Sequence, residues 1–165
     1  MKEPPASRSI VFQTRTGTSM RAEVRLEPPI ERQRAAVEIH ARACPSARLR
    51  SITSAYNCVG MVVATRRGWV EPDELLMILR EDGYRKLPGE ADAKEGDVVV
   101  YRLPNQGVSH VGIVVGKNIV ADHNADALVI LSKWGMDGEY VHNATALPAL
   151  LGRPAEYWTD RKDLP

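Results

Sequence analysis

The stretch that decides the fold occupies residues 56–64 and reads YNCVGMVVA. After the cysteine it is almost wholly apolar, which is typical of a helix buried nearly all round. Ser54 or Asn57 is placed to cap such a helix, which we expect to run from Cys58 into Arg67. A thiol at the N-terminus of a helix lies beside free N–H groups and the positive end of the helix dipole. The sequence therefore predicts a lowered thiol pKa and a nucleophilic Cys58.

The second decisive stretch, VSHVGIVVG at residues 108–116, places a histidine at the start of a β-branched strand. Alternation along a strand puts Gly112 on the same side as His110, and a small residue there lets a helix approach closely. An imidazole beside a thiol acts as general base and later as general acid. We therefore expect Cys58 and His110, distant in the chain, to meet as nucleophile and base. The N–H of Cys58 is a candidate oxyanion donor.

Shorter patterns organise the rest of the chain into helices first and strands afterwards. We expect a hairpin from strands 9–13 and 20–26, helices over 30–43 and about 71–83, and a helical piece near 147–151. Strand-like segments lie at 98–101, 108–115, 119–121 and 127–131, with a turn at 116–118 and a loop-like composition over 132–142. This order predicts an α+β fold in which the Cys-bearing helix packs on an antiparallel sheet.

Composition limits the classes of function. Twenty-two Lys and Arg against 21 Asp and Glu give a net charge of +1, which offers no global attraction to nucleic acid or an anionic membrane. The two cysteines cannot form a disulfide framework, and residues 1–7 lack the apolar core of a signal peptide. We therefore expect a single domain over residues 1–165 in the cytoplasm, or a secreted effector exported without a classical signal peptide.

Three motifs in order resemble a known superfamily. The segments NCVG at 57–60, GDVVVY at 96–101 and SHVGIVVG at 109–116 resemble NlpC-like and CHAP-like members of the papain-like cysteine hydrolases. Together with YNC, REDGY at 80–84 and SKWG at 132–135 followed by His142, they are similar to a group of small uncharacterised bacterial proteins in that superfamily.

The resemblance implies a papain-like domain that cleaves amide bonds, typically in peptidoglycan peptides. It makes Cys58 the nucleophile and His110 the base. It also divides the chain into an N-terminal hairpin and helix at 1–50, a catalytic core at 51–135 and a C-terminal extension at 136–165.

A third polar residue would orient the imidazole, and the sequence leaves its identity open. His123 is our first choice, because it lies on the far arm of the predicted hairpin; Asp122, Ser132, Lys133 and His142 are the alternatives. Asn57, Trp134 and His142 are predicted to bind substrate. With four histidines and neither a C-x-x-C nor an H-E-x-x-H motif, we expect no metal site and no cofactor.

These features predict a thiol-dependent hydrolase of peptide or isopeptide bonds that uses a Cys-His dyad or triad. Its expected substrate is a peptide or a peptidoglycan fragment, and a protein partner is an alternative ligand. Two other hypotheses stay open: an acyltransferase with the same site, and a catalytically silent papain-like module that binds a protein or peptide.

Overall fold

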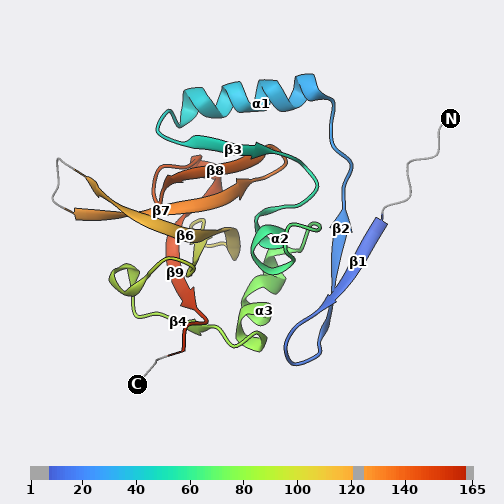
Figure 1. Cartoon of the computed structure of the whole chain (residues 1–165), viewed down its shortest axis with the longest axis vertical. Coiled ribbons are helices and arrows are strands. Elements are labelled where there is room, and N and C mark those ends of the chain that lie inside the picture. The colour runs from blue at the N-terminus through green and yellow to red at the C-terminus, as the bar shows by residue number, and fades with distance from the viewer. Residues whose placement is uncertain (1–7, 121–124, 163–165) are drawn as a thin grey trace.

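The computed structural model describes residues 8–120 and 125–162, and its main feature is a seven-stranded sheet (Figure 1). Every neighbouring pair of strands in this sheet is antiparallel, in the order β3-β8-β7-β6-β5-β9-β4. The molecule thus has a mixed α/β fold with a large antiparallel sheet and few helices, as predicted. The strands are β3 Arg48–Ile52, β4 Arg85–Lys86, β5 Val98–Arg102, β6 Val108–Val120, β7 Ala125–Trp134, β8 Gly138–Asn143 and β9 Arg153–Thr159.

A two-stranded hairpin precedes the sheet, and its turn is where the sequence predicts it. β1 (Arg8–Gln13) pairs with β2 (Ser19–Val24), and Gly17 takes a φ of 91° in the turn between them. Figure 1 shows α2 (Cys58–Val63) and α3 (Leu75–Glu81) between this hairpin and the large sheet. Residues from all of these parts share one apolar cluster, which includes Met20, Ala22, Cys58, Val59, Leu75, Ile78, Val98, Val100 and Val111.

The predicted helices at 30–43 and about 71–83 are confirmed. α1 spans Ile30–Ala43 and lies along β3 in Figure 1; the other consists of a 3₁₀ turn, Pro72–Glu74, followed by α3. Two further 3₁₀ turns cover Glu90–Asp92 and Ala149–Leu151, the second within the predicted helical piece. No helix in the described part of the chain is long and apolar enough to cross a membrane.

α2 is shorter than the sequence predicts, because it ends at Val63 rather than near Arg67. Thr65 and Arg66 have φ values of 49° and 64°, so the backbone leaves the helix in a left-handed turn. The chain then folds back over α2 so closely that a Cβ on Gly60 would lie 1.7 Å from the carbonyl oxygen of Gly68. Gly60 permits this fold-back because it has no side chain, and a helix period cannot reveal it.

Two predictions about the β-rich half are wrong. Instead of turning at 116–118, β6 continues to Val120, with a register irregularity between Val114 and Gly116. The segment 132–142 is not a loop, because it forms the end of β7, a turn at Gly135 and most of β8. Its polar side chains have the composition of a loop, yet most of them are buried in the sheet.

Candidate functional site

The candidate nucleophile is held by a capped helix start. The side chain of Asn57 caps α2 by accepting the Gly60 N–H at 2.8 Å, and it also accepts the Val70 N–H at 3.1 Å. Its amide nitrogen donates to the Val70 carbonyl at 2.7 Å. Asn57 is predicted to bind substrate, but its side chain here caps α2 at Gly60 and ties the helix start to the backbone of Val70.

The Cys58 thiol lies at the start of α2, where it is 8% exposed. Burial raises the pKa of this thiol. Backbone amides and a nearby cation lower the pKa by a smaller amount; they belong to Val111, Val59, Cys58 itself and Lys133. The net pKa is raised, so the predicted lowering is wrong for the resting protein. The helix start acts in the expected direction, but desolvation of a thiolate exceeds it.

His110 lies near the start of β6, 1% exposed, with its ring centroid 5.3 Å from that of Tyr101. Its Nε2 has no hydrogen-bond partner in the part of the chain that the structure describes. Burial, and then electrostatic interactions with His142 and Lys133, lower its pKa from 6.5 to about 3. The ring is therefore neutral at physiological pH and available to accept a proton.

The fold brings the two predicted catalytic segments together, but their side chains join different clusters. The Val111 amide lowers the pKa of Cys58, and His110 is the residue that precedes Val111. Val111 packs in the same apolar cluster as Cys58, whereas His110 pairs with Tyr101 on the opposite side of β6. Among the described residues no hydrogen bond joins the sulfur to the imidazole.

On the Cys58 side of the sheet lies an ionic cluster. Lys133 and Glu139 are paired across β7 and β8, and both are 0% exposed. The Lys133 ammonium donates to the Gly135 carbonyl at 2.7 Å and lies 5.7 Å from the centre of the Tyr56 ring. Burial lowers its pKa to about 8, against attraction from Asp137 and Cys58. Lys133 is thus a buried cation whose charge acts on the thiol.

Glu139 is the anion of this ionic cluster. Its carboxylate accepts hydrogen bonds from the Tyr56 hydroxyl, Arg50 Nη1 and Arg66 Nε at 2.6, 2.6 and 2.5 Å. Burial raises its pKa, but these donors lower it further, so the pKa is below its usual value. The carboxylate therefore stays ionised although it is fully buried.

On the other side of the same strands lies a neutral network. Trp134 Nε1 donates to Ser132 Oγ at 3.0 Å, and Ser132 Oγ lies 2.8 Å from His142 Nε2. His142 Nδ1 lies 2.8 Å from the Asn143 carbonyl, which can only accept. Nδ1 therefore carries the proton and Nε2 accepts from the Ser132 hydroxyl. The chain of donors is complete with His142 neutral, and burial also lowers its pKa.

The predicted substrate-binding residues Trp134 and His142 belong to this neutral network. They are 1% and 2% exposed, so they lie beneath the surface in the described structure. Ser132, an alternative orienting residue, contacts His142 and Trp134 rather than His110. His123 and Asp122 lie outside the described residues.

Sequence reasoning missed Glu139 and its donors Tyr56, Arg50 and Arg66 as parts of the site. The available signal is alternation: Lys133 and Glu139 fall on one face, while Ser132, Trp134 and Tyr140 fall on the other. That signal requires the strand assignment that a loop-like composition conceals.

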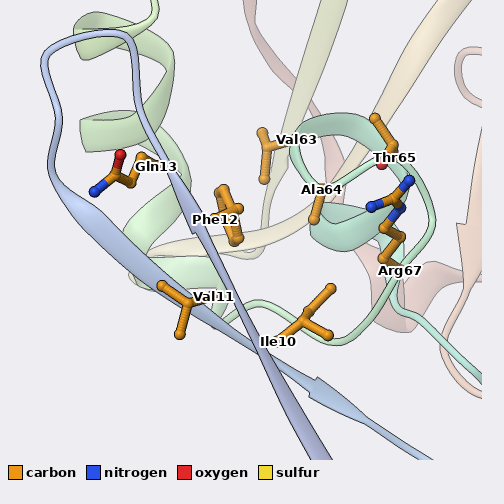
Figure 2. A pocket seen from close by; sticks show the side chains of 8 residues that line it. All are labelled: Ile10, Val11, Phe12, Gln13, Val63, Ala64, Thr65 and Arg67. Atoms are coloured by element: carbon orange, nitrogen blue, oxygen red, sulfur yellow. The ribbon is translucent and has the colours of Figure 1, made fainter.

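A separate hollow of about 460 Å³ lies between β1 and the end of α2 (Figure 2). Ile10, Phe12 and Val63 contribute to its apolar lining, and none of the predicted site residues that the structure describes lines it. Among the residues that the structure describes, no three His, Cys, Asp or Glu side chains gather closely enough to hold a metal ion.

Comparison of the chain with models of known protein families, with curated proteins and with solved structures found no match. The candidate site is therefore interpreted from its own geometry.

Proposed function

We propose that the protein is a papain-like, thiol-dependent hydrolase of amide bonds, with Cys58 as nucleophile and His110 as base. The single observation that carries the proposal is the packing of Cys58 in the same apolar cluster as Val111, the residue next to His110. A thiol at a helix start and an imidazole on an adjoining strand are the two groups that this chemistry requires.

The resting site holds a neutral thiol and a neutral imidazole, because burial acts on both pKa values in the direction that removes charge. An imidazole with a pKa of about 3 is too weak a base for a thiol whose pKa is raised, so substrate binding must bring both pKa values closer to the operating pH before the proton moves. His110 lies on the other face of β6 from the Cys58 sulfur at rest, so rotation of its ring alone cannot reach the thiol. The transfer requires the start of β6 to rearrange when substrate binds.

In the reaction, the Cys58 sulfur bonds to the substrate carbonyl carbon while its proton passes to His110. The carbonyl π electrons move to the oxygen, which the amide groups at the start of α2 stabilise. The tetrahedral intermediate expels the amine, which takes the proton from His110. Water then hydrolyses the thioester, releasing the acid and restoring the thiol.

Lys133 supports this chemistry by electrostatics. Its charge favours the thiolate, and it is buried where the field between charges is weakly screened. We assign it the role of stabilising negative charge at the sulfur rather than that of a base, since its ammonium already donates to Gly135. The substrate is a peptide or a peptidoglycan fragment.

A second candidate is a papain-like module that binds a protein or peptide without turnover. The observation that favours it is the closure of the site, because Cys58 and His110 are 8% and 1% exposed. The two candidates differ in one respect that can be measured: only the hydrolase forms a covalent acyl intermediate.

The experiment uses p-nitrophenyl acetate, a generic activated ester, and locates the transferred acetyl group by peptide mass spectrometry. We expect the acetyl group on Cys58, loss of thiol-dependent turnover in Cys58→Ser, and unchanged turnover in the matched control Cys44→Ser. His110→Gln should slow turnover by about 10²-fold or more. Turnover that survives Cys58→Ser, or acetyl found on Cys44 alone, would eliminate the hydrolase. Product masses with added glycinamide separate transfer to an amine from hydrolysis.

A further inference from the structure

The buried carboxylate of Glu139 holds two arginine side chains in fixed positions at the surface. Arg50 and Arg66 donate to different oxygens of this carboxylate, and the Tyr56 hydroxyl shares one of them. The side chain of Glu139 is 1% exposed, so the anchor is rigid and excludes water. Both guanidinium groups are therefore placed before any ligand arrives.

Each guanidinium has donors to spare. A guanidinium carries five N–H groups, and Glu139 receives one hydrogen bond from each of the two arginines. Their side chains are 53% and 39% exposed, so each guanidinium is partly open to solvent. Two guanidinium groups on one carboxylate form a fork that suits a second carboxylate on the solvent side.

The backbone is strained where it presents Arg66. Thr65 and Arg66 both take positive φ values, which cost a non-glycine residue about 1 kcal/mol or more each. This turn brings the Arg66 amide to the Gly60 carbonyl at 3.0 Å and its side chain to Glu139. A left-handed turn that the chain keeps without glycine is a feature of functional segments.

These arginines adjoin the thiol through residues common to both. Tyr56 precedes Cys58 by two residues and donates to Glu139, and Lys133 lies over the Tyr56 ring while its charge acts on Cys58. A ligand bound by Arg50 and Arg66 would therefore lie on the same face of the sheet as the Cys58 sulfur.

We propose that Arg50 and Arg66, held on Glu139, form a subsite for a carboxylate of the ligand that reacts at Cys58. The inference deepens the proposed function and rests on it for the identity of the reacting group. It makes the substrate an acidic peptide or acyl compound whose carboxylate lies near the bond that is cleaved.

The test compares two alkylating reagents that differ in charge, iodoacetate and iodoacetamide, by the rate at which each modifies Cys58. Cys44 in the same molecule supplies the reference ratio. We expect the iodoacetate to iodoacetamide ratio at Cys58 to exceed that at Cys44 by about tenfold, which corresponds to a single favourable charge contact. Arg50→Gln and Arg66→Gln should each lower the Cys58 ratio, and Arg66→Lys should retain part of it.

Arg67→Gln is the matched control, because Arg67 is an exposed neighbour of Arg66 without a hydrogen bond to Glu139 among the described residues. It should leave the Cys58 ratio unchanged. Equal ratios at Cys58 and Cys44, or a Cys58 ratio that neither Arg50→Gln nor Arg66→Gln alters, would overturn the subsite.

A second measurement keeps this inference separate from the proposed function. If neither reagent modifies Cys58, the proposal that Cys58 is the nucleophile is contradicted. The carboxylate subsite is then tested separately, by thermal unfolding. N-acetylglutamate should raise the midpoint in a saturable way, and the neutral N-acetylglutaminamide should not. This difference should vanish in Arg50→Gln and persist in Arg67→Gln. No difference between the two compounds in the wild-type protein would refute the carboxylate site.

Discussion

The two faces of the sheet at β7 and β8 carry polar clusters of opposite character. On the face toward α2, Lys133 and Glu139 are ions, and the arginines on Glu139 extend into solvent. On the other face, Ser132, Trp134 and His142 form a neutral chain of hydrogen bonds that is closed to solvent. Residues adjacent in sequence therefore lie in different electrostatic environments.

This difference separates two requirements of a thiol site. The ionic face can stabilise charge at the sulfur, because a cation is buried beside it. The neutral face keeps His110 uncharged, chiefly because burial disfavours the imidazolium. The two faces should thus respond to pH in different ranges, and to mutation by different amounts.

The largest effect should follow from neutralising the anchor of the ionic face. Glu139→Gln leaves the carboxylate's three donors facing a neutral amide, and we expect a loss of about 3 kcal/mol in the free energy of unfolding. Urea denaturation measures it. Glu38→Gln, on the exposed surface of α1, is the control and should change stability by less than about 0.5 kcal/mol. Equal effects for both variants would mean that Glu139 has no structural importance.

Mild acid should lower the stability of the protein through the neutral face. The pKa of His110 is 6.5 in the unfolded chain and about 3 in the fold, so below pH 6.5 only the unfolded state gains the proton. Stability should fall by about 2 kcal/mol between pH 7 and pH 5 on account of this residue, and His142 adds in the same direction. Denaturation of His110→Leu should show a correspondingly flatter profile. An unchanged acid profile in this variant would contradict the buried neutral imidazole.

The ionic face should gain stability in mild alkali. Lys133 has a pKa of about 8 in the fold and 10.5 when unfolded, so between these values the folded state has lost a proton that the unfolded state keeps. Stability should rise by about 1.5 kcal/mol from pH 8 to pH 9.5. Lys133→Met should remove this rise. Denaturation midpoints of the wild type and of Lys133→Met at pH 8, 9 and 9.5 test this prediction. If stability still rises with pH in Lys133→Met, another group is responsible for the rise.

The local elements that the sequence predicts well have signals in their own residues. The hairpin around Gly17, the helix at 30–43 and the helix that follows Pro72 each combine a periodic pattern with a turn or cap residue. The same holds for the start of α2. The sequence offers Ser54 or Asn57 as the cap of this helix, and Asn57 is the residue that caps it. Local chemistry decides these features, so one chain suffices to infer them.

Features that depend on contacts between distant residues could not be predicted from the sequence. β9 pairs with β5 and β3 pairs with β8, but neither segment shows an alternation strong enough to predict a strand. β7 and β8 carry polar residues that become buried only because partners from other elements satisfy them, as Arg66 does for Glu139. The sequence singles out Cys58 and His110 as candidates, but it could not reveal that burial governs both pKa values.

The most direct test of the account is the pH dependence of Cys58 alkylation by iodoacetamide, with Cys44 as the internal reference. We expect a thiol pKa above the ordinary value, and no change in His110→Leu, since the resting imidazole is neutral and lies on the other face. Lys133→Met should change the thiol pKa little, because Lys133, with a pKa of about 8, loses its proton before the thiol does. A Cys58 pKa below the ordinary value that rises in His110→Leu would indicate a thiolate-imidazolium pair and contradict the resting site described above.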